Sequence, residues 1–440
     1  MSKRTDRRRV LIVGGGFAGL KVAQSLRKAP AEVLLVDRKN YHLFQPLLYQ
    51  VATGTLSPAN IAAPLRVVLR RQRNAEVVLG EVTDFDVPGR RAILSDGKIA
   101  YDTLVVAAGS RYNYFGHDRW QQHAPSLKTL EDATEIRRRI LLSLEAAERE
   151  TDPAKRRQWL TFVIVGGGPT GVELAGALAE IARYTLRRDF RHVTPGDATI
   201  LLVEGLDRVL SSYPEELSRK AKIALEELGV QVQTRSLVTD VQSDGVCLKN
   251  GEKTQFVKAR TVLWTAGVLA CPLNEKLSAA TGAQRDRLGR IMVEPDLSLP
   301  GHPEIFVIGD MAHVLDADGN PLPGMAPVAI QQGRYVGRRI WREMRGETTP
   351  PFRYADRGAM ATIGRSRAVA NLKFLRLSGL LAWILWLFVH LMQLVSFQNR
   401  VLVFIQWAWN YLTFNRSACL ITERSAPPDE SSQQPPDACA

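Results

Sequence analysis

The sequence predicts an α/β protein that contains two related strand–turn–helix units and ends in apolar helices. The first observation is a glycine-rich stretch that occurs twice, at residues 10–20 (VLIVGGGFAGL) and 161–180 (TFVIVGGGPTGVELAGALAE). The second is that each unit closes with an apolar strand ending in small residues, at 101–110 and 261–268. The third is a run of 23 residues without formal charge, 377–399. Two copies of one pattern favour a repeated architecture over a chance glycine-rich turn that binds no ligand.

Length and composition are those of a globular protein with a basic charge balance. At 440 residues the chain can hold two or three domains, and 45% hydrophobic with 23% charged residues is ordinary for folded domains. The formal net charge of +13 and the pI near 9.7 favour an acidic partner, which could be nucleic acid, an anionic membrane surface or a charged substrate. The four cysteines have neither C-x-x-C nor metal-ligand spacing, so we expect no metal site.

The first unit consists of an apolar strand, a turn at Gly14, Gly16 and Gly19, and a helix. The first glycine permits the turn, the second lets backbone N–H groups approach a pyrophosphate, and the third lets helix and strand pack closely. The phosphates would then lie at the positive end of the helix dipole. The next strand ends at Asp37, 23 positions after Gly14, where a carboxylate can accept hydrogen bonds from a ribose diol. The alternative is that Asp37 only ends its strand.

The second unit repeats this arrangement with Gly166, Gly168 and Gly171. Its acidic strand end is Glu204, 38 positions after Gly166, and we attribute the long spacing to a basic insert between them. A carboxylate at that point suits a free 2′-hydroxyl and repels a 2′-phosphate, which favours NADH over NADPH, although Arg208 nearby acts in the opposite direction. Each unit can therefore cradle one dinucleotide.

Other segments are candidates for ligand contact. Residues 40–54 are apolar and aromatic but broken by proline and glycine, which predicts either a pocket wall or a buried connector. Each unit has small residues at the end of a strand, where a ligand could touch the backbone. They are Ala108 and Gly109 in the first unit and Ala266 and Gly267 in the second. A helical period at 127–150 joins the two units.

From residue 286 the chain is predicted to return to the first unit. Asp310 follows a short buried strand, at the strand end where α/β sheets bind ligands. The segment 326–334 (APVAIQQGR) then begins a helix that we expect to run to Met344. Gln331 and Gln332 near its start could contact a ligand, or they could be solvated helix residues.

Together the paired glycine turns, FQPLLY, the Gly-Asp strand end and APVAIQQG resemble type II NADH:quinone oxidoreductases, which are single-subunit flavoenzymes. The resemblance covers residues 10–414 and implies two Rossmann-like dinucleotide-binding domains of the glutathione-reductase type. The first would hold non-covalent FAD, and the second would hold NADH. The implied activity is oxidation of NADH with two-electron reduction of a membrane quinone, an entry to the respiratory chain without proton pumping.

The resemblance also implies roles for individual residues. The FAD contacts would be Gly14, Gly16, Gly19, Asp37, Leu47, Ala108, Gly109, Asp310 and Ala329. The NADH contacts would be Gly166, Gly168, Gly171, Glu204, Ala266 and Gly267. Glu173 and Gln331 would act in catalysis, by positioning or by handling protons. The quinone would contact Ala326, Gln331 and Gln332, in a motif where the family has Ala-Gln-x-Ala-x-Gln and this chain has Pro327 in place of the first glutamine.

The domain organisation is predicted from these motifs. The FAD-binding domain covers 1–125 and 281–347, with a connecting helix at 126–160 and the NADH-binding domain at 161–280 between its two parts. A membrane-anchoring region follows at 348–424. The tail at 425–440 is rich in Pro, Ser and Asp and is expected to be disordered.

The uncharged run 377–399 is long enough to span a bilayer, but its residue pattern favours a position at the membrane surface. Polar and aromatic residues form one stripe along it, and residues 401–414 are amphipathic. Basic residues flank the run on both sides, so two helices in one leaflet keep every cation at anionic headgroups, whereas a span would not. The residues expected at the membrane are Arg376, Trp383, Trp386, Arg400 and Trp407.

We therefore predict a monotopic, peripheral protein on the cytoplasmic face of the inner membrane of a bacterium. The alternatives are a single transmembrane span, and core or dimer-interface helices of a soluble domain. The expected partners are NADH, ubiquinone or menaquinone and anionic lipid, with no nucleic acid, and a homodimer is compatible with the resemblance.

Other activities use the same fold. Disulfide reductases need a C-x-x-x-x-C pair beside the flavin and sulfide:quinone oxidoreductases need cysteines facing it, and the sequence supports neither. An NADH oxidase or a ferredoxin reductase has a soluble acceptor and needs no apolar C-terminal segment. From a different class, the chain could be a binding protein that responds to flavin and NADH.

Overall fold

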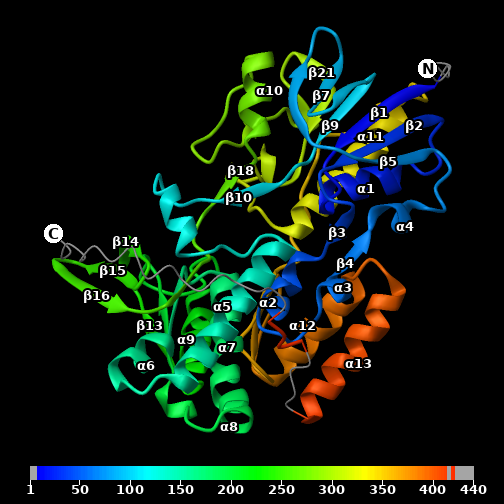
Figure 1. Cartoon of the computed structure of the whole chain (residues 1–440). Coiled ribbons are helices and arrows are strands. Elements are labelled where there is room, and N and C mark those ends of the chain that lie inside the picture. Colours follow the sequence, from blue (N-terminus) through cyan, green and yellow to red (C-terminus); the bar gives the residue numbers. More distant parts are fainter. Residues whose placement is uncertain (1–6, 414–417, 422–440) are drawn as a thin grey trace. The chain divides into compact units, whose positions relative to one another are not determined.

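The computed structural model describes residues 7–413 and 418–421, which form two compact units (Figure 1). Unit 1 consists of the described residues up to Leu43, of Ala62–Arg111 and of Val268–Asp356. Unit 2 consists of Phe44–Ile61, of Tyr112–Gly267 and of the described residues from Arg357 onward. The two glycine turns therefore belong to different units. The predicted domain boundaries stay a prediction, and the predicted tail lies outside the described residues.

Unit 1 is organised around a six-stranded sheet with the order β20-β21-β9-β1-β2-β5. Its strands are β1 (Arg8–Val13), β2 (Ala31–Asp37), β5 (Ala75–Leu79), β9 (Thr103–Val106), β20 (Ser298–Leu299) and β21 (His302–Val307). All neighbouring strands are parallel except β20 and β21, and the central strands are buried, as their unbroken apolar runs require. Because β21 pairs with β9, the predicted return of the chain to the first unit is confirmed.

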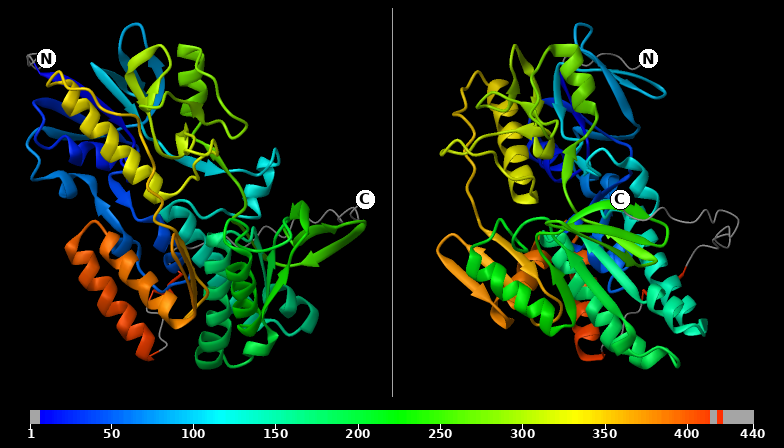
Figure 2. Two further views of the ribbon diagram at one scale, coloured as in Figure 1. Left: turned by 180° about the vertical axis from the view of Figure 1, so that it is seen from behind. Right: turned by 90° about the vertical axis from the view of Figure 1, so that its left-hand side faces the viewer.

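Helices α1 (Phe17–Ser25) and α11 (Ala326–Glu343) pack closely in unit 1 (Figure 2). A Cβ atom added to Gly333 would lie 2.3 Å from the carbonyl oxygen of Ala18, and one added to Gly337 would lie 2.5 Å from Cβ of Ser25. Glycine thus lets α11 approach the helix that follows the first glycine turn. The predicted helix from Ala326 is confirmed and ends one residue earlier than expected.

Smaller elements complete unit 1. They are β3 (Tyr41–Leu43), β4 (Ala62–Pro64), α4 (Leu65–Leu69), β6 (Val82–Asp86), β7 (Arg91–Leu94), β8 (Gly97–Ala100), β10 (Ser110–Tyr112, at the unit boundary), β18 (Val268–Ala270), α10 (Leu273–Thr281), β19 (Ile291–Met292), η5 (Gly309–Met311) and β22 (Ala312–His313). Strands β6, β7 and β8 form an antiparallel meander.

Unit 2 repeats the same plan in a four-stranded parallel sheet with the order β13-β12-β11-β17. Its strands are β11 (Thr161–Val165), β12 (Thr199–Val203), β13 (Val230–Gln233) and β17 (Thr261–Trp264). The hydrogen bond from the Gly14 N–H to the Val36 carbonyl, 2.8 Å, recurs between Gly166 and Val203, also at 2.8 Å. The prediction of two Rossmann-like units is confirmed.

Helix α7 (Pro169–Glu180) follows the second glycine turn, and α5 (Leu130–Arg149) confirms the helix predicted from the period at 127–150, which lies inside unit 2. Helix α5 begins with a capping box in which Thr129 and Asp132 each bond the other's backbone N–H. The remaining elements before residue 268 are η1 (Gln45–Leu47), α2 (Leu48–Ala52), α3 (Pro58–Ile61), η2 (Asp118–Gln122), α6 (Pro153–Trp159), the π-helical turn η3 (Ile181–Thr185), α8 (Leu186–Asp189), η4 (Pro195–Asp197), α9 (Glu215–Glu227), β14 (Leu237–Gln242), β15 (Gly245–Asn250) and β16 (Lys253–Lys258).

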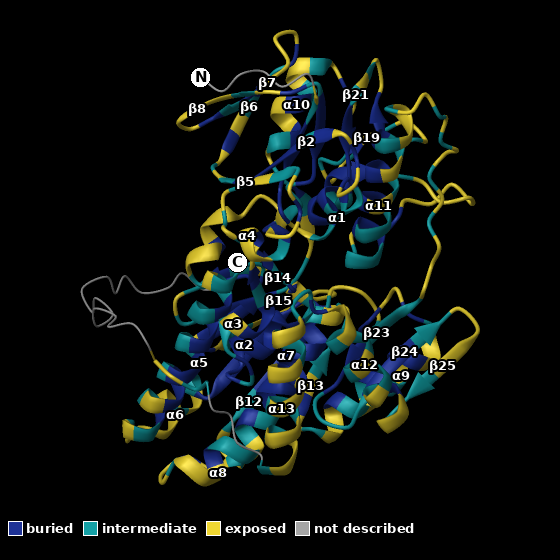
Figure 3. Ribbon diagram, turned by 90° about the vertical axis from the view of Figure 1, so that its right-hand side faces the viewer, coloured by how far each residue is buried: buried dark blue, intermediate teal, exposed yellow. Residues whose placement is uncertain are grey.

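The C-terminal part of unit 2 is a three-stranded sheet followed by two helices, with exposed residues along both helices (Figure 3). The elements are β23 (Ala359–Thr362), β24 (Ala368–Leu372), β25 (Leu375–Ser378), α12 (Leu380–Gln393) and α13 (Phe397–Thr413). The uncharged run 377–399 is therefore not one helix. It begins in β25, turns at Gly379, whose φ is +74°, and breaks again between α12 and α13. Within the described ranges, no helix combines the length and the apolar character needed to cross a bilayer.

The α1–α11 contact yields a stability prediction. Replacing Gly333 with Ala should lower the melting temperature by a few degrees, because overpacking typically costs about 1–3 kcal/mol while the gain in helix propensity is at most about 1 kcal/mol. Thermal unfolding with excess FAD present measures the shift. Gly97→Ala is the matched control, since a Cβ at Gly97 meets nothing within 4 Å. A Gly333→Ala protein as stable as the Gly97→Ala protein would contradict the close packing.

Candidate functional site

The first glycine turn has a backbone that favours glycine. Gly14 has a φ of +105°, and a Cβ there would lie 2.4 Å from the carbonyl oxygen of Ala107. A Cβ on Gly19 would lie 1.9 Å from the Gly14 carbonyl oxygen, so only glycine lets α1 pack onto this turn. At Gly16 an added Cβ meets nothing within 4 Å. The turn therefore combines close packing with open space at the N-terminus of α1.

Asp37, at the end of β2, is bound to this turn. Its carboxylate accepts hydrogen bonds from the N–H groups of Gly15 (2.5 Å) and Lys39 (2.7 Å). Burial raises the pKa of the Asp37 carboxyl, and the two N–H donors oppose that rise. His42 is attached to the same turn through its Nδ1, 3.0 Å from the Gly15 carbonyl, and burial lowers its pKa to about 4. The sequence indicated a carboxylate at this strand end but not its contact with the turn.

The second glycine turn has nearly the same geometry. Gly166 has a φ of +106°, and a Cβ there would lie 2.8 Å from the backbone nitrogen of Ala266. A Cβ on Gly171 would lie 1.9 Å from the Gly166 carbonyl oxygen, and one on Gly168 would meet nothing within 4 Å. Gly267, next along the chain from Ala266, has a φ of +68°. The predicted NADH contacts are thus brought together at one edge of the unit 2 sheet.

Glu204, at the end of β12, corresponds to Asp37. Its carboxylate accepts hydrogen bonds from the N–H groups of Gly167 (2.5 Å) and Leu206 (2.8 Å). Arg208 donates to the carbonyl of Ser211 at 3.2 Å. The longer spacing between turn and carboxylate leaves this contact unchanged, as the sequence interpretation expected.

In unit 1 the predicted flavin contacts Ala108, Asp310 and Ala329 lie around η5. The N–H of Ala108 is 3.0 Å from Sδ of Met311, and the Ser110 hydroxyl donates to Asp310 at 2.6 Å. A Cβ on Gly309 would lie 3.8 Å from Cβ of Ala329. Gly109, beside Ala108, has a φ of +75°. Leu47 belongs to unit 2, where it is fully buried in η1.

The glutamines of α11 have specific partners. Gln331 makes two hydrogen bonds with the backbone of Ala355, donating to its carbonyl at 2.9 Å and accepting from its N–H at 3.0 Å. Gln332 is buried and its side-chain oxygen accepts from the N–H of Gly309 at 2.6 Å. The interpretation as a solvated helix residue is therefore wrong for Gln332, whereas Gln331 is partly exposed and makes its two backbone bonds near the surface. Ala326 is the first residue of α11, followed by Pro327 at a position where no N–H is needed.

Glu173 lies in α7 of unit 2, where its side chain is buried. Burial raises the pKa of this carboxyl to about 8, and the N–H of Thr362 and the indole of Trp386 oppose the rise. A carboxyl with this pKa holds a proton at neutral pH. Such a group can bind and release protons near the pH of the cell.

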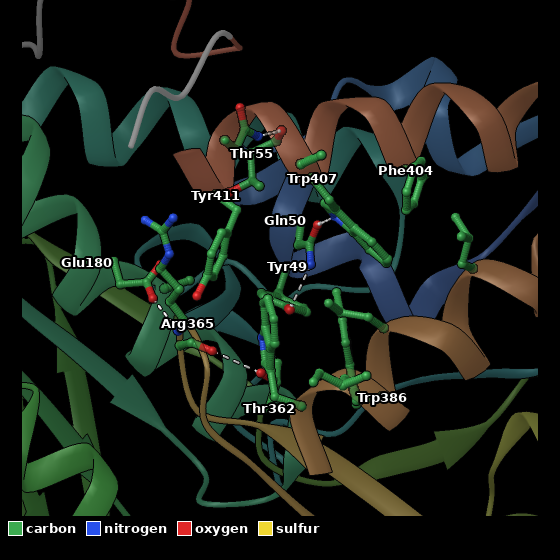
Figure 4. A pocket seen from close by; sticks show the side chains of 18 of the residues that line it. Tyr49, Gln50, Thr55, Glu180, Thr362, Arg365, Trp386, Phe404, Trp407 and Tyr411 are labelled. Carbon is green, nitrogen blue, oxygen red and sulfur yellow. Dashed lines mark hydrogen bonds between the residues drawn. The ribbon is translucent and has the colours of Figure 1, made fainter. Parts of the chain in front are cut away.

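Beside Glu173, Thr362 and Trp386, unit 2 contains an apolar cavity of about 550 Å³ (Figure 4). Its walls come from α2, α7, β23, α12 and α13, and they include Tyr49, Gln50, Thr362, Trp386 and Trp407. Gln50 joins α2 to α13, because its Oε1 accepts from the Trp407 indole at 2.7 Å; its Nε2 donates to the hydroxyl of the adjacent Tyr49 at 2.9 Å. The prediction of a pocket wall at residues 40–54 agrees with this lining. The sequence did not indicate the bridge, since its residues are far apart in the chain.

One predicted membrane residue needs correction. Trp386 is only 1% exposed and packs against Tyr49, His390 and Trp407, with ring centroids 6.5, 4.1 and 5.8 Å away. The prediction that it contacts a membrane is wrong, because its side chain is almost completely buried against these rings. Trp383 and Trp407 also line the cavity, Arg400 donates to the Leu394 carbonyl at 2.8 Å, and Arg376 is exposed.

Comparisons with known proteins agree with this geometry. Residues 8–333 match the family model of pyridine nucleotide-disulphide oxidoreductases, and residues 357–416 match the NDH2 C-terminal domain. The type II NADH:quinone oxidoreductase Ndh of Mycobacterium tuberculosis is 42% identical, over 96% of this chain and 91% of that protein. Its relative NdhA from the same organism is 41% identical, over 95% and 90%.

A similar fold is found in a solved structure, that of NDH2 from Plasmodium falciparum in complex with NADH. The TM-score is 0.85 at 20% identity, and the match covers 92% of this chain and 99% of the other. At that identity the likeness concerns the fold, whereas the two mycobacterial relatives match nearly the whole chain. The chain therefore belongs to the pyridine nucleotide-disulphide oxidoreductase family and, within it, to the type II NADH:quinone oxidoreductases.

Proposed function

We propose that this protein oxidises NADH and reduces a membrane quinone with the help of bound FAD. The reaction is NADH + quinone + H⁺ → NAD⁺ + quinol. The observation that carries the proposal is the repeated glycine turn with its carboxylate, once in each unit, together with the family to which the chain belongs. Bound FAD would supply the redox chemistry, accepting two electrons from NADH and passing them to the quinone.

The residues of unit 1 fit FAD. The open approach at Gly16 and the positive end of α1 suit a pyrophosphate, and Asp37 stands where it can also reach a ribose diol. Asp310, Ala108, Gly109 and Ala329 are the proposed contacts with the rest of the cofactor. Leu47 of unit 2 is proposed as a further apolar contact.

The residues of unit 2 fit NADH. Gly168 presents the N-terminus of α7 to the pyrophosphate, and Ala266 and Gly267 offer backbone at the neighbouring strand end. Glu204 would accept hydrogen bonds from the adenosine ribose. Arg208 donates to the Ser211 carbonyl and keeps its positive charge, so it would act on a 2′-phosphate in the direction opposite to that of the Glu204 carboxylate.

The cavity of unit 2 is the proposed site for the quinone, which could be ubiquinone or menaquinone. Aromatic and aliphatic walls suit an apolar ring and chain, and the Gln50 bridge offers polar atoms within them. Glu173 would hold the proton that the quinone needs on reduction. Gln331 would act by positioning, since its amide is bonded to Ala355, and the roles of Ala326 and Gln332 at the quinone stay a prediction.

The quinone would arrive from a membrane to which the protein is bound peripherally. Leucine, isoleucine and aromatic side chains are exposed along α12 and α13, for example Leu381 (68%), Phe388 (62%) and Leu412 (76%). Exposed apolar surface of this extent marks an interaction site. We propose the cytoplasmic face of a bacterial inner membrane with anionic lipid as its location, and a homodimer stays a prediction.

Steady-state kinetics test the proposed function. Purified protein in detergent should oxidise NADH rapidly with a short-chain quinone, and much more slowly with oxygen as the acceptor. If oxygen served as well as the quinone, the protein would be an NADH oxidase rather than a quinone reductase.

Replacing Glu204 with Gln tests the choice of nicotinamide cofactor. Loss of the negative charge should reduce the preference for NADH over NADPH by about 10-fold, which corresponds to about 1.4 kcal/mol of electrostatic repulsion. The ratio of kcat/KM for the two donors measures it. The Asp207→Asn variant is the matched control, because Asp207 is close in sequence and does not end a strand. An unchanged ratio in Glu204→Gln would remove the carboxylate from cofactor selection.

Replacing Glu173 with Gln tests the proton donor. The carboxyl is protonated below a pKa of about 8, so quinone reduction should be fast at neutral pH and slow down as the pH rises through 8. Glu173→Gln should lower kcat by roughly 100-fold and abolish that decline, while FAD stays bound. The exposed Glu226→Gln serves as control. Turnover and pH profile equal to those of the natural enzyme would exclude Glu173 from the mechanism.

A further inference from the structure

Strands β24 and β25 form a hairpin whose tip carries an exposed aromatic ring. The last pair of the ladder is Leu372 with Leu375, so Lys373 and Phe374 make the turn. Phe374 is 92% exposed and Leu375 is 52% exposed. The Lys373 ammonium lies 5.6 Å from the centroid of the Phe374 ring. Phe374 is the most exposed of the large apolar side chains in the described part of the chain. Adjoining exposed apolar residues mark an interaction site where they form a patch, and Phe374 and Leu375 adjoin.

The segment that carries this tip has charges of one sign, whereas the neighbouring helix α9 carries four carboxylates, Glu215, Glu216, Glu226 and Glu227. Between residues 357 and 413 the sequence has six cations and no carboxylate, and Lys373 and Arg376 flank the two exposed apolar residues. The carboxylate that acts electrostatically on Arg376 is Glu216 of α9, and it is ion-paired with Lys220 at 2.8 Å. The tip thus combines two apolar side chains with two cations, as segments that insert into anionic membrane interfaces do.

We propose that the β24–β25 tip, Lys373–Arg376, is a membrane-inserting finger that acts separately from helices α12 and α13. Phe374 and Leu375 enter the interfacial layer of the bilayer, while Lys373 and Arg376 bind anionic lipid headgroups. The inference rests on the proposed membrane attachment and adds a second point of contact to it. Strand β25 leads through Gly379 directly into α12, so three residues, 377–379, separate the finger from the first apolar helix.

The charge pattern favours lipid over a second copy of the chain as the partner of the tip. If the tip lay on the axis of a two-fold symmetric dimer, it would face the same tip of the second copy. That would bring cations against cations with no carboxylate from residues 357–413 between them. An anionic bilayer complements the same charges.

Vesicle binding tests the proposal. Full-length protein is mixed with sucrose-loaded phosphatidylcholine vesicles, with or without phosphatidylglycerol, and the bound fraction is measured after sedimentation. Phe374→Ser should weaken binding to the anionic vesicles by about 10-fold, the factor expected when one buried aromatic side chain is lost. Phe374→Trp should bind as well as the natural protein, and its added indole should be quenched by brominated lipids. Replacing both Lys373 and Arg376 with Gln should weaken binding mainly at low salt.

Two controls separate this proposal from the proposed function. Leu315→Ser removes an apolar side chain of unit 1 that is 52% exposed, and it should leave vesicle binding unchanged. Turnover with a short-chain quinone and FAD content should stay normal in Phe374→Ser, which shows that the protein is folded.

If the natural protein binds vesicles and Phe374→Ser binds equally well, the finger is excluded but membrane attachment stands. If the natural protein binds no vesicles, both the finger and the proposed membrane attachment are overturned. A Phe374→Ser protein that loses only self-association would assign the tip to a second copy.

Discussion

The hydrogen bond between a strand-end carboxylate and the glycine turn beside it is the interaction on which both units depend. Asp37 bonds the N–H of Gly15 and Glu204 bonds that of Gly167, at 2.5 Å in each case. A tight glycine turn leaves backbone N–H groups without helical partners, and a carboxylate satisfies one of them while it fixes the turn. The remaining N–H groups at the start of the helix can then receive a pyrophosphate. In the proposed complexes, the same side chain that shapes the turn would therefore stand beside the ribose of the dinucleotide.

Much of the fold could be predicted because its signals are local. The glycine turns, the β-branched strands and the alternation of small residues at strand ends each lie within about ten residues, and parallel pairing follows from them. The limits of the C-terminal helices could not be predicted from the uncharged run, because residues 375–378 pair with β24 and form a strand there. Composition alone does not distinguish a short apolar strand from the start of a helix.

The site was predicted less completely than the fold, because many of its contacts are not local in the sequence. The positions of Gly16, Gly168, Asp37 and Glu204 follow from spacing, whereas the partners of the side chains depend on contacts distant in sequence. The hydrogen bonds between Gln331 and Ala355 could not be predicted from the sequence, and Trp386 was expected at a membrane but lies buried beside Glu173. The Gln50–Trp407 bridge joins residues on α2 and α13 and could be found only in the folded chain. Burial at this place also raises the pKa of Glu173, which no local pattern indicates.

The central claim is that electrons pass from NADH through bound FAD to a quinone, and its two halves can be measured separately under anaerobic conditions. Stopped-flow absorbance follows the bleaching of the flavin when NADH is added and the return of its colour when a quinone is then mixed in. Both phases should be fast enough to support steady-state turnover. A flavin that NADH bleaches but that the quinone fails to reoxidise would contradict it, and would show that the acceptor is not a quinone.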